Sequence, residues 1–419
     1  MRIAVIGSGI SGLAAAWLLR ERHDVVLFEK ADRLGGHAHT VLHRETDGRP
    51  LALDTGFLVY NERTYPLLTR LFERLSVASV ASEMSFGVSC VRPDIEYAVS
   101  SVRALLAQPA NALRPWYYGF LRDVVRFGRR GREVLQNAPD PTVTVTDFLA
   151  AERFGDAFGR LYLLPMVAAI WSSGTGQVGG FPRDTLLRFF DNHGLLTVTG
   201  QPQWRTVADG SRSYVDRIGA DLAGRVRLGA GVKTLVRGDR EVEVRLDDGS
   251  ADRFDHAVVA AHANQALRML SDPTDAEREL LGAWRYSVND TWLHTDRTLL
   301  PRRRPAWASW NYLLSDRDAA EPEVTVSYHL NRLQGVDSDR DYLVSLNPQR
   351  EPAADTVIRR MTYHHPVYDS TSVASQADLP RLDGVRRTHF CGAYQRNGFH
   401  EDGLWSATRV VADLGGASL

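Results

Sequence analysis

Apolar residues at the start of the chain follow the pattern of a strand, a helix and a second strand. Ile3–Ile6 is a short apolar run, and residues 13–19 are apolar at every position. Val25–Phe28 is apolar throughout, which is typical of parallel strands that are buried on both faces. The pattern therefore predicts a βαβ unit at the very start of the chain.

Two further patterns occupy the middle of the chain. Residues 64–75 and most of 100–151 have the apolar spacing of amphipathic helices, and residues 158–171 are apolar enough to form a buried helix. Short alternating segments then predict an antiparallel sheet, the floor of a second domain, while His364-His365 before a proline is expected in a loop. The strands of this sheet are expected at 292–294, 308–312, 324–328 and 342–346.

A glycine-rich turn connects the first strand to the first helix. Gly7, Gly9 and Gly12 have separate tasks: one allows the tight turn, one lets the backbone approach a pyrophosphate, and one lets helix and strand pack closely. The N–H groups that begin the helix point toward the phosphates. Glu29 ends the second strand, where its carboxylate can accept from ribose hydroxyls and would repel a 2′-phosphate. The expected ligand is an unphosphorylated adenine dinucleotide.

Length, charge and cysteine content narrow the class of protein. A chain of 419 residues is expected to form two or three compact units, and its net charge of −1 gives no general attraction for nucleic acid. Cys90 and Cys391, the only cysteines, suit a reducing cytoplasm. The first apolar stretch belongs to the glycine motif rather than to a signal peptide, and no apolar run predicts a membrane span. His37 and His39 lack a third ligand nearby, so no metal site is expected.

The residues after Glu29 resemble a known fingerprint. Arg33, Gly35 and Gly36 complete an E-x-x-x-R-L-G-G arrangement that resembles the second dinucleotide motif of the flavin amine oxidase superfamily. Over nearly the whole chain, ordered segments resemble a bacterial branch of these FAD-dependent flavoproteins, whose relatives often accompany cyclopropane-fatty-acyl synthase type methyltransferases. Further matching segments include Asp54-Thr55-Gly56-Phe57, Ile170-Trp171, Gly210-Ser211-Arg212, Phe390-Cys391-Gly392-Ala393-Tyr394 and Gly398-Phe399-His400-Glu401-Asp402-Gly403.

The resemblance implies an α/β fold, in which a Rossmann-like FAD-binding domain of the two-dinucleotide-fold type is interleaved with an α+β substrate domain. The FAD-binding domain is expected at 1–80, 200–270 and 370–419, and the substrate domain at 81–199 and 271–369. The implied function is an FAD-dependent oxidoreductase that acts by hydride transfer to flavin and desaturates or isomerises an apolar, fatty acyl-like substrate. Two alternatives are an amine or amino-acid oxidase of a biosynthetic pathway and a flavin-binding partner subunit of a methyltransferase or reductase.

The FAD site is expected to draw on both ends of the chain, because the N-terminus of the last helix can direct its N–H groups at the pyrimidine edge of the flavin. Asp402 is expected to cap this helix. His37 stands where typical amine oxidases have an arginine. The expected cofactor-binding residues are Gly7, Gly9, Ile10, Ser11, Gly12, Glu29, Lys30, Arg33, Gly35, Gly36, His37, Thr55, Gly56, Phe57, Val232, Gly392, Ala393, Asp402, Gly403 and Leu404.

Acid–base candidates are His400 and Glu401 beside the expected flavin edge, together with His364, its neighbour His365, and Tyr328. Flavin amine oxidases commonly hold a water near the flavin with a lysine of the substrate-domain sheet. This chain has only two lysines, Lys30 beside Glu29 and Lys233 on an adenine-side strand, which disfavours an amine oxidase that uses this device. The alternative amine site would use Trp171, Trp310 and Tyr394 as aromatic walls.

Aromatic residues and arginines alternate at helical spacing in residues 114–132. The segment fits an entrance for an amphiphilic substrate or a membrane-surface contact, and it equally fits a packed helix with a solvated arginine face. The expected partners are accordingly a small apolar or amphiphilic substrate, a peripheral membrane contact and a methyltransferase, with no nucleic acid.

Overall fold

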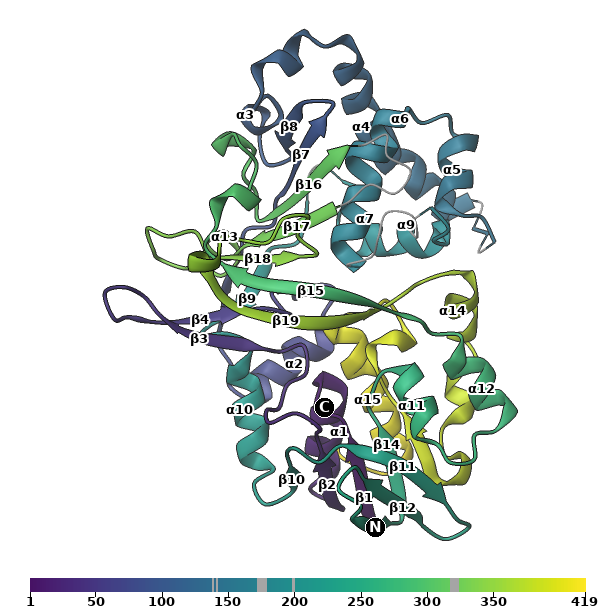
Figure 1. The fold of residues 1–419 in the computed structure, drawn as a ribbon. Helices are drawn as coiled ribbons and strands as arrows, with labels where there is room; N and C mark the ends of the chain where they lie inside the picture. The colour runs from purple at the N-terminus through teal and green to yellow at the C-terminus, as the bar shows by residue number, and fades with distance from the viewer. Residues whose placement is uncertain (138, 141, 172–178, 198–199, 317–323) are drawn as a thin grey trace.

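The protein was analysed as a computed structural model that describes residues 1–137, 139–140, 142–171, 179–197, 200–316 and 324–419. A five-stranded parallel sheet with the order β10-β2-β1-β14-β20 lies near the N-terminus (Figure 1). Its strands come from distant parts of the chain. They are β1 (Arg2–Ile6), β2 (Asp24–Phe28), β10 (Val226–Arg227), β14 (His256–Val259) and β20 (Thr388–Phe390).

Both faces of this sheet are covered, which explains the continuous apolar runs of its strands. Ile3 and Val5 of β1 belong to a core with residues of four helices. Ala4 and Ile6 point to the other face, where they belong to a core with residues of a three-stranded antiparallel sheet. The helices are α1 (Ile10–Leu19), α2 (Pro66–Arg74), α10 (Arg212–Asp221) and α15 (His400–Asp413), and the strands are β11 (Val232–Arg237), β12 (Val242–Leu246) and β13 (Ala251–Phe254).

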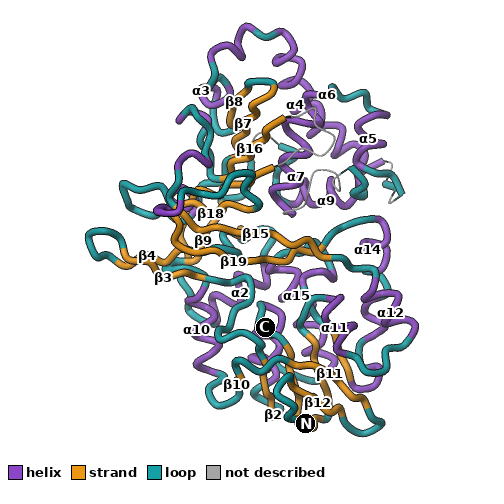
Figure 2. The backbone as a smooth tube through the Cα atoms, in the orientation of Figure 1, coloured by secondary structure: helices purple, strands orange, loops and turns teal. Residues whose placement is uncertain are grey.

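The second domain contains a seven-stranded sheet with the order β19-β15-β18-β17-β16-β7-β8. Its first two strands, β19 (Val357–Pro366) and β15 (Tyr286–His294), pair antiparallel and cross the middle of the molecule side by side (Figure 2). The other strands are β7 (Phe86–Arg92), β8 (Ile95–Ala98), β16 (Trp310–Asp316), β17 (Val324–His329) and β18 (Leu343–Leu346). The loop predicted at His364-His365 is wrong, because both residues pair with β15 as the last part of β19.

Helices lie beside this sheet, as Figure 1 shows for α4, α5, α7 and α9. They are α3 (Val102–Leu105), η1 (Pro109–Leu113), α4 (Pro115–Asn137), α5 (Val145–Ala151), α6 (Asp156–Phe158), η2 (Gly159–Leu163), α7 (Leu164–Trp171) and α9 (Arg183–Asn192). In the part of the chain that the structure describes, no helix is long and apolar enough to cross a membrane.

The remaining elements are short. They are the hairpin β3 (Thr40–Arg44) and β4 (Pro50–Asp54), the sheet of β5 (Tyr60–Asn61), β6 (Ser79–Ala81) and β9 (Trp204–Val207), the helices α11 (Ala263–Met269), α12 (Asp275–Gly282), α13 (Leu330–Leu333) and α14 (Ser370–Ser375), and the short turns η3 (Arg297–Leu299), η4 (Arg304–Ala306), η5 (Ala354–Thr356), η6 (Leu379–Leu382), η7 (Val385–Arg387) and η8 (Ala393–Gln395).

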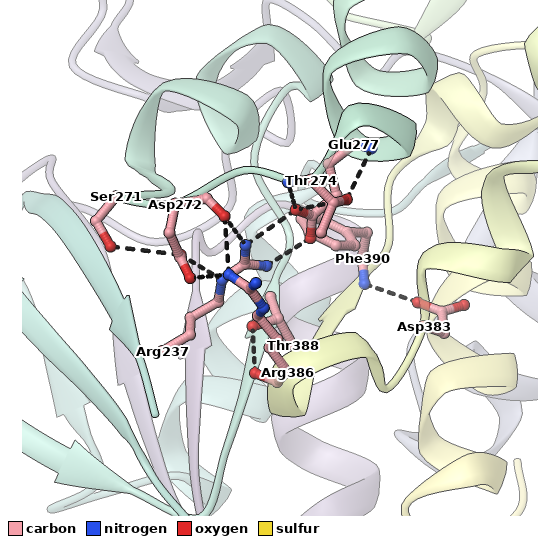
Figure 3. Close-up of polar contacts among 9 residues, drawn as sticks. All are labelled: Arg237, Ser271, Asp272, Thr274, Glu277, Asp383, Arg386, Thr388 and Phe390. Atoms are coloured by element: carbon pink, nitrogen blue, oxygen red, sulfur yellow. Dashed lines mark hydrogen bonds and ion pairs between the residues drawn. The ribbon is translucent and has the colours of Figure 1, made fainter. Parts of the chain in front are cut away.

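A buried ion pair ties β11 to α12 (Figure 3). The side chains of Arg237 and Glu277 are both 0% exposed, and the guanidinium donates to both carboxylate oxygens. The same guanidinium also donates from Nε to Asp272 at 3.0 Å, and Asp272 is in turn paired with Arg386 just before β20. Burial pushes the pKa of Glu277 up, but the hydrogen bonds and charge of Arg237, together with the hydrogen bonds from Thr274, outweigh it and leave that pKa below its ordinary value. Three separate chain segments therefore depend on one guanidinium.

We expect Arg237→Met to lower the free energy of unfolding by about 3–5 kcal/mol, because removing one partner leaves the other charge buried and unpaired. Urea unfolding followed by circular dichroism measures the loss. The matched control is Arg245→Met on the adjacent strand, where a half-exposed pair with Glu243 is worth about 1 kcal/mol or less. An equal loss in the two variants would contradict a special role for the buried pair.

Candidate functional site

The glycine turn after β1 combines close packing with one open position. A Cβ on Gly12 would lie 1.8 Å from the carbonyl oxygen of Gly7, and a Cβ on Gly7 would lie 2.8 Å from that of Ala260. A Cβ on Gly9, in contrast, would meet no protein atom within 4 Å. The first N–H groups of α1, from Ile10 onward, have no acceptor within the helix. The turn therefore fits the pyrophosphate of a dinucleotide, which needs space above the middle glycine and N–H donors beside it.

Glu29 is held at the mouth of this turn. One carboxylate oxygen accepts from the N–H and hydroxyl of Ser8 at 2.9 and 2.6 Å, and the other accepts from the N–H of Ala31 at 2.8 Å. The oxygen that accepts from Ala31 keeps a lone pair for a ribose hydroxyl, whereas the other oxygen is fully occupied by Ser8. The backbone of Ala230 donates to the carbonyl of Glu29, which brings the start of β11 at Val232 to the same edge. Lys30 is exposed beside it.

The second motif lies directly against the first. The N–H of Gly35 donates to the carbonyl of Ser8 at 3.0 Å, and a Cβ on Gly36 would lie 3.0 Å from the Cα of Gly9. Arg33 turns back on its own loop and donates to the carbonyl of Gly36 at 2.9 Å. The two glycine motifs thus form one continuous surface.

Residues 37–39 pair with residues 55–57. The N–H of Phe57 donates to the carbonyl of His37 at 2.9 Å, and a Cβ on Gly56 would lie only 2.2 Å from that oxygen. Thr55 donates from its N–H to the carbonyl of His39 at 3.0 Å. The Asp54-Thr55-Gly56-Phe57 segment is therefore next to the glycine motifs, and Gly56 tolerates no side chain.

The C-terminal segment closes the site from the other end of the chain. A Cβ on Gly403 would lie 2.8 Å from side-chain atoms of both Ile10 and Ser11, so α15 and α1 begin in contact. The N–H of Gly392 donates to Ser406 at 2.9 Å, which holds the turn at Ala393 against α15. Leu404 is buried in the core below. The expected convergence of the two chain ends is present.

Asp402 caps α15, as predicted: its carboxylate accepts from the N–H of Phe399 at 3.0 Å. Burial raises the pKa of Asp402 to about 7. A carboxyl group with this pKa is partly protonated near neutral pH, which limits negative charge at the start of the helix.

The predicted acid–base residues do not all converge on one place. His400 stacks on Phe57 with ring centroids 3.8 Å apart, and burial lowers its pKa to about 3, which leaves a neutral imidazole. Both oxygens of Glu401 accept from N–H groups of Leu67 and Leu68, so this carboxylate caps the first turn of α2. Its contacts are structural ones, because α2 begins with N–H groups that need acceptors.

Tyr328 is buried in β17, where its ring packs edge-on against Trp310 at 5.1 Å. Two strands, β18 and β15, separate β17 from β19, which carries His364. The structure therefore places Tyr328 in the sheet core, apart from His364.

A cluster of histidines that the sequence reasoning did not assemble lies at the junction of the two domains. The His37 ring is 5.2 Å from that of His365 and 6.4 Å from that of His262, and the His262 ring is 6.1 Å from that of His364. Tyr363 stacks on His37 at 5.0 Å. We define these four histidines as the histidine cluster. Its members come from the Arg33 loop, the residues after β14 and the end of β19. Because these segments are far apart in the sequence, only knowledge of how β19 pairs could have indicated the cluster.

Burial keeps most of the cluster neutral. It lowers the pKa of His37 to about 4 and that of His262 to about 3, and it lowers the pKa of His365 well below its ordinary value. Within the described ranges, no group of three histidine, cysteine or acidic side chains could hold a metal ion. These lowered pKa values make His37, His262 and His365 weak bases, so the cluster offers acid–base chemistry only through a proton taken up and returned during a reaction.

An aromatic wall stands above the start of α15. Trp171 packs against Phe181 and Phe189 with ring centroids 4.9 and 4.6 Å apart, and Phe189 stacks on Phe399 at 4.9 Å. The Trp171 indole donates to the carbonyl of Asn397 at 3.1 Å. We define Trp171, Phe181, Phe189 and Phe399 as the aromatic wall. Trp310 and Tyr394, the other two aromatic residues expected to line an amine site, lie elsewhere. Trp310 packs on Tyr328, and Tyr394 packs on Trp284.

Comparisons with known proteins agree with this geometry. Residues 10–343 match the family described as flavin containing amine oxidoreductase. A carotenoid phi-ring synthase from Streptomyces griseus is 31% identical over 170 residues, and the match covers 38% of this chain and 32% of that protein. This chain therefore spans about a third of the length of that curated relative.

Solved structures share the fold over nearly the full chain. A CLA-producing fatty acid isomerase from P. acnes has a TM-score of 0.70 at 16% identity, covering 98% of each chain. Cyclohexylamine oxidase from Brevibacterium oxydans has a TM-score of 0.69 at 16% identity, covering 99% of each chain. The family match extends over most of the chain and agrees with the dinucleotide site. The chain belongs to the flavin containing amine oxidoreductase family, and it is an FAD-dependent oxidoreductase.

Proposed function

We propose that the protein desaturates or isomerises an apolar, fatty acyl-like substrate. The observation that carries the proposal is the aromatic wall beside the start of α15, where the acidic residues are already engaged. Glu401 caps α2, and Asp402 caps α15. An alkyl ammonium substrate would require a carboxylate or a cage of free aromatic faces. The rings of the wall instead contact one another, which favours an apolar substrate.

The positions of the lysines support the same proposal. Lys30 is exposed at the end of β2, and Lys233 is exposed on β11, so both belong to the dinucleotide side of the molecule. Neither lies on the seven-stranded sheet, where the amine oxidase device would require a lysine. The amine or amino-acid oxidase alternative would therefore need a different arrangement.

Relatives with apolar substrates add to the proposal. The chain is similar to a carotenoid phi-ring synthase, and one structure with the same fold is a fatty acid isomerase. Amine oxidases are structural neighbours as well, so the fold alone does not discriminate. The likeness to a branch that accompanies cyclopropane-fatty-acyl synthase type enzymes fits an acyl substrate, and it makes a methyltransferase the proposed partner.

The flavin, when bound, supplies the hydride chemistry. The chain's own residues must orient an apolar substrate, exclude water and hold a proton. We assign orientation and water exclusion to the aromatic wall. His364 in the histidine cluster is the proposed proton acceptor, because an imidazole side chain can take and return a proton during a reaction. His400 beside Phe57 is a weaker candidate, because its lowered pKa of about 3 makes it a poor base.

We expect Gly9→Val to lower FAD affinity at least about tenfold, the change that a loss of about 1.4 kcal/mol in binding produces. The added side chain occupies the space above the turn without meeting protein atoms at its Cβ. Flavin absorbance per purified chain measures the loss, and circular dichroism verifies the fold. Gly119→Val is the control, because a Cβ on this α4 glycine also meets nothing within 4 Å. Normal flavin content in Gly9→Val would contradict the assigned cradle.

We expect anaerobic holoprotein to act on unsaturated or methylated fatty acyl lipids. The measurement is bleaching of flavin absorbance together with mass spectrometry and chromatography of the lipid products, because an isomerase can act without net bleaching. A panel of primary amines and amino acids is the comparison, and flavin-free Gly9→Val protein is the blank. Bleaching by amines alone, or no product and no bleaching with any acyl lipid, would overturn the proposed substrate class.

We expect Asp402→Asn to gain stability relative to the native chain as pH rises. The unfolded chain loses the Asp402 proton near 3.8, whereas the folded chain holds it to about 7, so the native chain loses stability between these pH values. The difference reaches at most about 4 kcal/mol, since one pKa unit corresponds to about 1.4 kcal/mol. Urea unfolding of FAD-stripped protein at several pH values measures it. Exposed Asp413→Asn, on the same helix, is the control, and a pH-independent difference for Asp402→Asn would contradict the prediction.

A further inference from the structure

One end of the second domain exposes an unusual concentration of apolar side chains. This end contains α3, η1 and the first turns of α4, and it lies opposite the N-terminus and β1 (Figure 1). Leu113 is 85% exposed and Val102 is 74% exposed. Among the described residues, thirteen large hydrophobic side chains are exposed, and six of them fall within residues 99–118. We define these six as the apolar cap: Val99, Val102, Leu106, Leu113, Trp116 and Tyr118.

The backbone beneath the cap is firmly held. Tyr117 is fully buried, and its hydroxyl donates to the carbonyl of Leu105 at 2.7 Å. Buried Asn111 donates to the carbonyl of Glu96 in β8 at 3.1 Å, and the hydroxyl of Ser101 caps α3. The apolar side chains are therefore presented outward by an anchored segment, since the groups below them already have partners.

The same end carries more arginines than acidic residues. Residues 99–132 contain seven arginines and a single acidic residue, Asp123, while Glu133 just beyond pairs with Arg129 and Arg130, and Glu152 also pairs with Arg130. The Asp123 carboxylate is buried, and it accepts from the N–H of Gly155 at 2.9 Å. On α4, Tyr118, Arg122, Val125 and Arg129 are all exposed at spacings of four, three and four, which puts them on one helical face. Apolar and cationic side chains thus alternate along the outer face of α4.

We propose that the apolar cap and the outer face of α4 dock on the surface of an anionic phospholipid bilayer. Apolar side chains enter the headgroup boundary, while the long arginines keep their guanidinium groups at the lipid phosphates. A second copy of the chain is a poorer occupant, because a symmetric contact would place the same arginines against each other. The exposure and charge of this surface do not depend on which substrate the enzyme uses, so the docking proposal is independent of the proposed substrate. Docking there would give an enzyme direct access to acyl chains.

The test uses FAD-loaded protein and flotation with vesicles of phosphatidylcholine, with or without phosphatidylglycerol. We expect binding to the anionic vesicles that weakens as salt is added. Leu113→Ser combined with Trp116→Ser should lower the partition constant about tenfold or more, because two large side chains no longer enter the bilayer. Arg122→Gln combined with Arg129→Gln should remove most of the preference for phosphatidylglycerol. Flavin content verifies that each variant is folded.

The matched control is Leu42→Ser combined with Val288→Ser, which removes two exposed apolar side chains outside the cap and should leave vesicle binding unchanged. Absence of binding to anionic vesicles would overturn the proposal, and so would equal losses in the cap variant and the control. Concentration-dependent dimers that the cap variant abolishes, without any vesicle binding, would make the cap an interface between copies and also overturn it. Because no readout requires turnover, failure here is distinct from failure of the proposed substrate.

Discussion

The site depends on backbone segments that approach one another more closely than any side chain allows. Gly12 packs against the carbonyl of Gly7, Gly36 against Gly9, and Gly403 against the first residues of α1. A Cβ would force each contact to widen, because the added carbon would lie at most 3.0 Å from the neighbouring atom. Among the glycines of these contacts, Gly9 alone faces open space at its own Cβ position. The arrangement leaves one place for a pyrophosphate, and it requires the first and last helices to begin side by side.

Low net charge is the second property of the region around this cradle. The buried histidines have lowered pKa values, and Asp402 holds its proton to about pH 7. Both carboxylate oxygens of Glu401 accept hydrogen bonds from N–H groups of α2. Burial is the common cause, because desolvation disfavours the charged form of acids and bases alike. Such surroundings suit an apolar substrate. They also leave acid–base work to groups that are neutral before the reaction begins.

Sequence reasoning succeeded where partners are close in the chain. The βαβ unit and the Asp402 cap rest on a continuous apolar period and on contacts within a few residues of one another. It failed at β19, whose arginines and histidines hide the strand pattern until its pairing with β15 is known. Glu401 was predicted as an acid–base candidate from its place beside the expected flavin edge. Its hydrogen bond with the N–H of Leu67 could not be predicted, because the two residues are 334 positions apart in the chain.

The sequence by itself predicted a dinucleotide site, because glycine spacing and the acid at the strand end carry that chemistry locally, and the resemblance of its ordered segments predicted the family that the family match shows. Only the tertiary structure decided which polar groups meet: the histidine cluster, the buried Arg237–Glu277 pair and the apolar cap each require knowledge of which surfaces are covered. Burial and pairing over long separations are properties of the packed chain. They set pKa values and exposed faces, which no local pattern of residues specifies.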